Sequence, residues 1–323
     1  MDIKTKSRIQ TSEYNEPQQE AQFETSSLGQ PTKHSFKHTF HAYLELTKPK
    51  VVAMLMVTAL AGMHLATDAS LPLPLLIWST LGLTLGMSGA AAINHLADQR
   101  ADAKMHRTRN RPLVQGNVST RNALIFAIGL CLSSIVILDT FVNRLTCVLT
   151  IGGMAGYALI YTMYLKRATP QNIVIGGLSG ALPPLLGWTS ITNEVHPHAL
   201  LLVLLIFVWT PPHFWALAIH RRDDYAKADV PMLPVTHGIE FTKTQIILYC
   251  VMLLVTSFLP YLSGMSGFLY LSVATVSGLI FLGYAVKLKY KPTPKLAMQT
   301  FGFSIVYLLL VFPALLIDHS MQL

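Results

Sequence analysis

Residues 73–104 read LPLLIWSTLGLTLGMSGAAAINHLADQRADAK, an apolar run that ends in amide, carboxylate and basic side chains. Its apolar part, residues 73–97, has about the length that a helix needs to cross roughly 30 Å of hydrocarbon. Similar runs recur along the chain, at residues 51–68, 122–142, 145–164, 172–192, 198–219, 244–263, 266–286 and 298–317. We therefore expect an all-α polytopic membrane protein with nine transmembrane helices.

The composition of the 323-residue chain favours the same fold class. Apolar residues make up 52% and charged residues 12%, and the mean hydropathy is +0.45, whereas a soluble domain has about 25% charged residues. So little charge cannot cover a soluble surface, which excludes a soluble enzyme, a disordered protein and a fibrous repeat. Cys131, Cys147 and Cys250 lie far apart in apolar runs, so we expect no disulfide framework and no CxxC metal site.

Residues 1–40 differ from the rest of the chain. They contain ten of its 40 charged residues, are rich in Gln, Ser, Thr and Glu, and have no apolar run. We predict a disordered cytoplasmic tail over residues 1–40, followed by a transmembrane domain over residues 41–323. The tail lacks the apolar core of a secretory signal, and its four Glu and single Arg fit a mitochondrial transit peptide poorly. We expect a bacterial inner (cytoplasmic) membrane.

The basic residues provide a test of the helix count. If the N-terminus lies inside, 23 of the 24 Lys and Arg residues fall on inside segments, and only Arg144 falls outside. A miscounted helix would scramble this asymmetry, so the positive-inside rule supports nine helices with a cytoplasmic N-terminus and an outer C-terminus. The net charge of +8 is then mainly a topology signal, and we expect no nucleic-acid partner.

Three polar residues follow the apolar run at helical spacing. Asn94, Asp98 and Asp102 lie at i, i+4 and i+8, so on a helix they form one ridge. The same spacing leads backward to Gly86 and Gly82, which would let a neighbouring helix approach closely. We expect the polar ridge to face packed protein at the cytoplasmic end of the helix, not lipid.

The side chains around this ridge suggest a site for a metal and a phosphate group. Amide and carboxylate oxygens suit Mg²⁺, which shares its coordination shell with substrate phosphates, and Lys104, Arg107 and Arg111 would bind the remaining phosphate oxygens. The alternative is a solvated loop, because the positive-inside rule already predicts the basic residues. That rule does not predict Asn94 and Asp98 at a helix end.

A second polar cluster follows the sixth apolar run. His213, His220 and Asp224 lie at i, i+7 and i+11, which predicts one helical stripe on the same cytoplasmic side. If the helices pack in one bundle, the two clusters face each other. The alternative for each histidine is a structural role, since polar aromatic residues are common at membrane boundaries.

Several sequence strings are characteristic in combination. They are LTKPK at 46–50, NxxxDxxxD at 94–102, MxRTxxRPL at 105–113, YT at 161–162, LKR at 165–167, TPQNIVIGG at 169–177, GALPPLLGW at 180–188, PPHFWALA at 211–218, DY at 224–225 and PMLPV at 231–235. With these strings the chain resembles the UbiA superfamily of intramembrane prenyltransferases from Leu46 to about Pro313. TPQNIVIGG, PPHFWALA and PMLPV point to its haem-modifying branch, the protohaem IX farnesyltransferase family.

The resemblance implies nine helices around a central cavity, with Mg²⁺ as cofactor and farnesyl diphosphate and haem B as substrates. Asn94, Asp98 and Asp102 match the first metal-binding motif. The diphosphate ligands that it implies are Lys104, Arg107, Arg111, Lys166 and Arg221.

The second motif departs from the DxxxD pattern of quinone-type relatives. Arg221 and Tyr225 stand in its two acidic places, with Asp223 and Asp224 between them. We take Asp224 as a metal ligand and include Asp223 and Tyr225 among the catalytic residues, but which acid completes the second metal site stays open. Asp229 is a weaker candidate.

The mechanism that this resemblance implies is ionisation of farnesyl diphosphate to an allylic cation. The haem vinyl group attacks the cation and water adds, which gives haem O and diphosphate. The aromatic faces of Tyr161, Trp215 and Tyr225 would stabilise the cation, with interfacial anchoring as their alternative role. We expect His213 to orient or ligate haem iron, with His220 behind it.

Two other functions remain as alternatives. A UbiA-type enzyme that prenylates an aromatic acid such as 4-hydroxybenzoate would carry the same diphosphate site. A multipass transporter would place its ionisable residues near the bilayer midplane, whereas here the acids lie at cytoplasmic helix ends. Beyond the lipid bilayer and the substrates, the resemblance suggests haem A synthase or terminal oxidase assembly proteins as partners.

Overall fold

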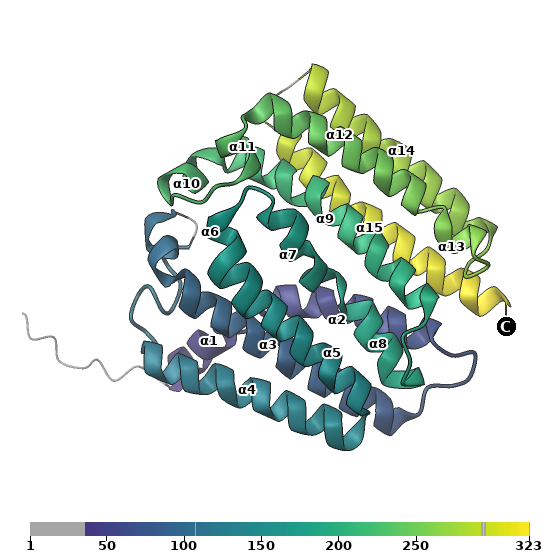
Figure 1. The fold of residues 1–323 in the computed structure, drawn as a ribbon, viewed down its shortest axis with the longest axis horizontal. Helices are drawn as coiled ribbons and strands as arrows, with labels where there is room; N and C mark the ends of the chain where they lie inside the picture. The colour runs from purple at the N-terminus through teal and green to yellow at the C-terminus, as the bar shows by residue number, and fades with distance from the viewer. Residues whose placement is uncertain (1–35, 107, 292, 294, 323) are drawn as a thin grey trace, which may run out of the picture.

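The structure is a computed structural model, which describes residues 36–106, 108–291, 293 and 295–322. Every regular element in this part of the chain is a helix (Figure 1). In chain order the helices are α1 (Phe36–Leu46), α2 (Pro49–Leu65), α3 (Leu73–Lys104), α4 (Thr120–Phe141), α5 (Arg144–Ala155), η2 (Gly156–Leu165), α6 (Lys166–Ala168), α7 (Asn172–Ala181), α8 (Pro183–Thr192), α9 (Pro197–His220), α10 (Arg222–Lys227), α11 (Leu233–Thr236), α12 (Ile239–Thr256), α13 (Leu259–Leu262), α14 (Phe268–Tyr290) and α15 (Leu296–Gln322).

The described residues contain eight helical segments long and apolar enough to cross a membrane, from Leu73–Lys104 to Leu296–Met321. The α1 and α2 helices, bent by 49° at their junction, pass the same test together and give up to nine. The predicted all-α, multi-span fold is thereby confirmed. The predicted tail falls mostly outside the described residues, and α1 begins at Phe36, a few residues before the predicted boundary.

The helices form two groups that pack side by side (Figure 1). The α9, α12, α14 and α15 helices form one group, and α2, α3, α4, α5, η2 and α8 form the other. The α7 helix packs against both η2 and α9 and so joins the groups. Trp215, Tyr270, Phe281 and Tyr307 are fully buried in the main apolar cluster, which lies mostly in the first group.

Glycines allow backbone contact between α2 and α8. A Cβ atom added to Gly62 would lie 2.1 Å from the carbonyl oxygen of Pro184, and one added to Gly187 would lie 1.9 Å from that of Ala59. No larger side chain fits at either position, so small residues on both helices set the approach, as is common between membrane helices. Gly187 and Pro184 both belong to the GALPPLLGW string.

Small residues also hold α3 against α4, as the ridge of glycines predicts. A Cβ atom added to Gly82 would lie 2.6 Å from Leu138, and one added to Gly86 would lie 2.8 Å from the Ser134 hydroxyl. That hydroxyl donates a 2.7 Å hydrogen bond to the Gly82 carbonyl oxygen. Packing along this face supports α3 to its C-terminal end at Lys104, where the polar ridge lies.

Candidate active site

The polar ridge lies on the last three turns of α3 and is buried. Asn94, Asp98 and Asp102 are only 4%, 3% and 2% exposed. Burying an unpaired carboxylate costs far more than folding can supply, so such groups require counter-charges and hydrogen bonds. The ridge therefore faces protein, as predicted, and each of its side chains has a partner.

Each carboxylate of the ridge pairs with a basic side chain from another part of the chain. Lys166, the first residue of α6, places its Nζ 2.7 Å from Asp98. Arg111, in the loop after α3, places its Nη1 2.5 Å from Asp102. The Thr108 hydroxyl donates to the carbonyl oxygen of Asp102 at 3.0 Å and folds the same loop back onto α3.

Asn94 is held by both of its side-chain atoms. Its Oδ1 accepts a hydrogen bond from Lys48 Nζ, and its Nδ2 donates to the Thr162 hydroxyl at 3.1 Å. Lys48 lies at the junction of α1 and α2 with φ 51° and ψ 58°, a left-handed conformation that costs free energy for a side chain other than glycine. Backbone strain of this kind concentrates at functional sites.

The π-helix η2 packs against α3 beside the ridge. A π-helix is a rare form that occurs mostly at functional sites. The Thr162 hydroxyl donates to the carbonyl oxygen of Tyr157, five residues earlier, at 2.8 Å. The rings of Tyr157 and Tyr161 stack with centroids 5.7 Å apart.

Gly176 of the TPQNIVIGG string makes room for the Tyr161 ring. A Cβ atom added to Gly176 would lie 2.1 Å from a ring carbon of Tyr161. The aromatic side chain therefore lies directly on the α7 backbone, which fixes the position of the ring. Gly176 is therefore needed because any side chain at this position would overlap the Tyr161 ring.

The chain that follows the second polar cluster contacts the C-terminal end of α3. Lys104 Nζ lies 3.0 Å from a carboxylate oxygen of Asp229, with both side chains exposed. Asp224 is 25% exposed and lies 3.6 Å from Arg221, whereas Asp223 is 87% exposed and lies 3.9 Å from Arg222. Both clusters therefore sit at the same end of the bundle, and Asp224 is the better sheltered acid.

The family to which the chain belongs follows from its similarity to known proteins. The model of the UbiA prenyltransferase family matches residues 55–310. Protoheme IX farnesyltransferase of Colwellia psychrerythraea is 59% identical over 280 residues, which cover 87% of this chain and 92% of that protein. The chain belongs to the UbiA prenyltransferase family. The predicted resemblance is thereby confirmed.

Solved UbiA-type structures share the fold at low sequence identity. A structure of digeranylgeranylglyceryl phosphate synthase matches with a TM-score of 0.75 and 17% identity, and covers 88% of this chain and 99% of that one. A UbiA homologue from Archaeoglobus fulgidus, bound to GPP and Mg²⁺, matches with a TM-score of 0.56 and 18% identity over 85% and 99% of the two chains.

His213 is buried between α9 and α15 in this UbiA fold. Its ring stacks between Trp209 and Phe301, with centroid distances of 4.2 and 4.5 Å, and its Nδ1 lies 2.6 Å from the Ser304 hydroxyl. That hydroxyl donates to the carbonyl oxygen of Phe301. With the hydroxyl donating to Phe301, the serine oxygen would accept from Nδ1–H of His213, in the tautomer that leaves a lone pair on Nε2.

The predicted stripe of His213, His220 and Asp224 does not form. The α9 helix ends at His220, and α10 begins at Arg222 after a break at Arg221, so Asp224 belongs to another helix. His213 is buried and His220 is exposed, so the two histidines face different surroundings. Trp215 packs edge-on against Tyr249 of α12.

One predicted site residue cannot be placed, and two residues that contact the ridge were not predicted. Arg107 lies outside the described residues. Lys48 and Thr162, which contact Asn94, belong to the LTKPK and YT strings, yet spacing alone did not mark them as site residues. The strings were the only available signal, since Lys48 precedes Asn94 by 46 positions.

The donor set of the α3 ridge fits a hard cation. Among the described residues, no three His, Cys, Asp or Glu side chains gather as a metal site. The ridge instead combines one amide with two carboxylates, all projecting from one helix face. These oxygen donors match the ligand preference of Mg²⁺, which needs few protein ligands because phosphate oxygens and water complete its shell.

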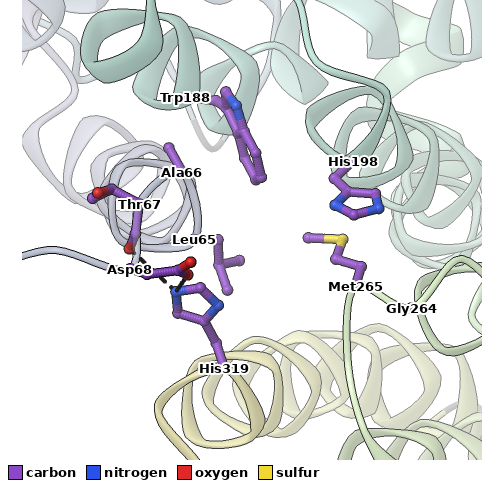
Figure 2. A pocket seen from close by; sticks show the side chains of 9 residues that line it. All are labelled: Leu65, Ala66, Thr67, Asp68, Trp188, His198, Gly264, Met265 and His319. Carbon is purple, nitrogen blue, oxygen red and sulfur yellow. Dashed lines mark hydrogen bonds and ion pairs between the residues drawn. The ribbon is translucent and has the colours of Figure 1, made fainter. Parts of the chain in front are cut away.

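A cavity of about 260 Å³ lies at the other end of the bundle (Figure 2). His319 of α15 lies 3.7 Å from Asp68 and 3.3 Å from the carbonyl oxygen of Thr67, and Trp188 and His198 form part of the walls. The length of α9 alone separates His198 from the α10 end by roughly 30 Å. None of the predicted site residues lines this cavity.

Proposed function

We propose that the chain transfers the farnesyl group of farnesyl diphosphate to a vinyl group of haem B, with addition of water, to give haem O and diphosphate. The observation that supports this proposal is the buried ridge of Asn94, Asp98 and Asp102, whose acids pair with basic side chains. The chain that contains it is 59% identical to a protoheme IX farnesyltransferase. We further propose Mg²⁺ as the cofactor, because the UbiA homologue from Archaeoglobus fulgidus has been solved with GPP and Mg²⁺ and with DMAPP and Mg²⁺.

The ridge side chains would hold Mg²⁺, with Asp224 as the acid contributed by the second cluster. When bound, Mg²⁺ neutralises negative charge on the leaving diphosphate. Lys166 and Arg111 already lie at the ridge and would donate hydrogen bonds to the remaining phosphate oxygens. Lys104 and Arg221 lie at the same end and would serve as further diphosphate ligands.

Ionisation breaks the bond between farnesyl C1 and oxygen, and the electron pair leaves with the diphosphate. The aromatic faces of Tyr161 and Tyr225 would stabilise the allylic cation by about 1–2 kcal/mol each. The vinyl π electrons of haem then form the new carbon–carbon bond. Water captures the cation that remains on the haem substituent and releases a proton, so no covalent enzyme intermediate is needed.

His213 is the better of the two histidines for orienting haem. Its Nδ1 is engaged by Ser304, which leaves Nε2 with a lone pair, and metal-binding histidines are usually oriented in this way by a second hydrogen bond. Its stacking between two aromatic rings limits rotation of the imidazole. His220 is exposed at the end of α9 and is the weaker candidate.

We place the enzyme in a bacterial inner membrane with the ridge end in the cytoplasm. The Lys and Arg residues concentrate at that end, and Arg144 alone lies on the other side of the proposed topology. The N-terminus would be cytoplasmic and the C-terminus would lie outside. A partner that receives haem O, such as haem A synthase or an oxidase assembly protein, follows from the proposed product.

An acceptor assay tests this function. Purified protein is incubated with farnesyl diphosphate and Mg²⁺ together with either haem B or 4-hydroxybenzoate, and the products are analysed by mass. We expect a hydroxyethylfarnesyl haem and no prenylated hydroxybenzoate. Prenylation of hydroxybenzoate alone would assign the chain to the other type of UbiA enzyme.

A further inference from the structure

Each polar side chain of the ridge contacts a basic side chain from a different segment of the chain. Asn94 accepts from Lys48 at the α1–α2 junction, Asp98 pairs with Lys166 of α6, and Asp102 pairs with Arg111 of the loop after α3. These cations therefore contact the side chains that Mg²⁺ would bind. A metal ion added beside them would be repelled by their positive charge.

The cations lie closer to solvent than the acids they neutralise. The side chain of Lys166 is 14% exposed and that of Asp98 is 5% exposed, and the values for Arg111 and Asp102 are 21% and 3%. An arriving group would therefore meet the basic side chains first. Lysine and arginine have long side chains, so their charged ends can move while the shorter acids stay fixed on α3.

The charges at the ridge determine which ligands can bind there. The two carboxylates are already neutralised by Lys166 and Arg111, so Mg²⁺ alone would leave an excess of positive charge at the ridge. A diphosphate alone would bring negative charge against two buried carboxylates. Mg²⁺ and a diphosphate together balance each other, and the diphosphate offers new partners to the displaced cations.

Resting on the proposed function, we propose that Lys48, Lys166 and Arg111 block the ridge against a metal ion alone and transfer to the diphosphate when both arrive. Mg²⁺ and the prenyl diphosphate then bind as a coupled pair, each raising the affinity for the other. Before that exchange, the amine of Lys48 contacts Asn94. The enzyme thus assembles its metal site only around the substrate.

Metal binding to the full-length protein without substrate tests the block. Mn²⁺ binding is measured by electron paramagnetic resonance for the wild type and for Lys166→Met and Lys166→Arg. We expect Lys166→Met to bind Mn²⁺ at least about tenfold more tightly than the wild type, a coupling of the usual size between two sites. Lys166→Arg keeps the positive charge and should behave like the wild type.

A matched control comes from another buried lysine. Lys243 lies 2.7 Å from Glu240, but here the lysine is 6% exposed and the acid 69%, the reverse of the order at the ridge. Lys243→Met should leave Mn²⁺ binding unchanged. Equal Mn²⁺ affinity for wild type and Lys166→Met would overturn the block, as would the same gain in Lys243→Met.

The coupling is tested by thermal unfolding with farnesyl thiodiphosphate, an analogue that ionises slowly. We expect Mn²⁺ and the analogue together to raise the wild-type melting temperature by more than the sum of their separate shifts. Additive shifts would overturn the coupling. Arg111→Gln, measured in the same way, should bind Mn²⁺ alone more tightly and show less coupling, which keeps the test available if Lys166→Met unfolds.

Neither measurement contains haem, so the inference and the proposed function can fail separately. Coupled binding without a farnesylated haem product would contradict the acceptor assignment and leave the exchange of partners intact. Haem farnesylation by a protein that binds Mn²⁺ alone tightly would contradict the exchange and leave the function intact.

Discussion

Buried acids at the two ends of the bundle are neutralised in different ways. Asp318 of α15 is 5% exposed and accepts hydrogen bonds from the Tyr270 backbone N–H at 2.8 Å and from the Ser266 hydroxyl at 3.2 Å. Asp98 and Asp102 are as deeply buried, but their partners are the charged ends of Lys166 and Arg111. Neutral donors hold Asp318 in the fold, whereas Asp98 and Asp102 pair with charged side chains that would transfer to the diphosphate in the proposed exchange.

The same contrast extends to the basic residues. The ridge end uses Lys and Arg, while the cavity at the other end uses histidine, with His319 beside Asp68 and His198 across the cavity (Figure 2). Permanent positive charge suits a site that binds diphosphate. The contact of His319 with the exposed Asp68 joins α15 to the end of α2.

The largest effect is expected from Asp98→Asn. This change removes a negative charge that the Lys166 pair and the proposed metal both require, while the amide keeps the shape of the side chain. Turnover of farnesyl diphosphate should fall about a hundredfold or more, the usual loss when an electrostatic group is removed from an active site. Steady-state product formation measures it, and wild-type activity in a folded Asp98→Asn protein would contradict the metal assignment.

Asp318→Ala should affect stability instead of chemistry. Without the carboxylate, the Tyr270 N–H and the Ser266 hydroxyl lose their shared acceptor, at a cost of about 1–3 kcal/mol for each buried group left unpaired. The melting temperature should fall, while activity per folded molecule stays near that of the wild type. A selective loss of activity without a change in melting temperature would remove the distinction between the two ends.

Ser304→Ala tests the orientation of His213 with a smaller effect. Loss of the hydroxyl frees Nδ1 and lets the imidazole change its tautomer, so the affinity for haem B should fall a few-fold. The affinity for farnesyl thiodiphosphate should not change. Haem titration followed by absorbance gives the first value, and an equal loss of both affinities would indicate a general packing defect.

The smallest effect is expected at the exposed ion pair between the end of α3 and the loop after α10. Lys104 and Asp229 are 56% and 82% exposed, and surface ion pairs contribute about 0–1 kcal/mol. Asp229→Ala should therefore change the free energy of unfolding by less than about 1 kcal/mol, as measured by thermal melting. Lys104→Ala should in addition weaken diphosphate binding slightly if Lys104 is one of its ligands.

The helices and the ridge could be predicted because both depend on local periodicity. Apolar runs of membrane-spanning length and an i, i+4, i+8 spacing are visible in a single sequence. The π-helix over Gly156–Leu165 could not be predicted, since i→i+5 bonding has no local sequence pattern and the contacts of Tyr161 and Thr162 there are with other helices. The pairing of Lys48 with Asn94 joins distant segments and leaves no local pattern.

The failed stripe of His213, His220 and Asp224 shows a second limit. Helical spacing assumes an unbroken helix, but α9 ends at His220 and the chain turns at Arg221. None of the residues there is glycine or proline, so the break has no sequence signal of the usual kind. It follows from the packing of α10 and α11 at the end of the bundle.

The most direct test compares the haem products of three proteins. Wild type, Asp98→Asn and Asp318→Asn are each incubated with haem B, farnesyl diphosphate and Mg²⁺, and the extracted haem is identified by mass. We predict a hydroxyethylfarnesyl haem from the wild type and from folded Asp318→Asn, and unchanged haem B from Asp98→Asn. Unchanged haem from the wild type, or farnesylated haem from Asp98→Asn at the wild-type rate, would contradict the account.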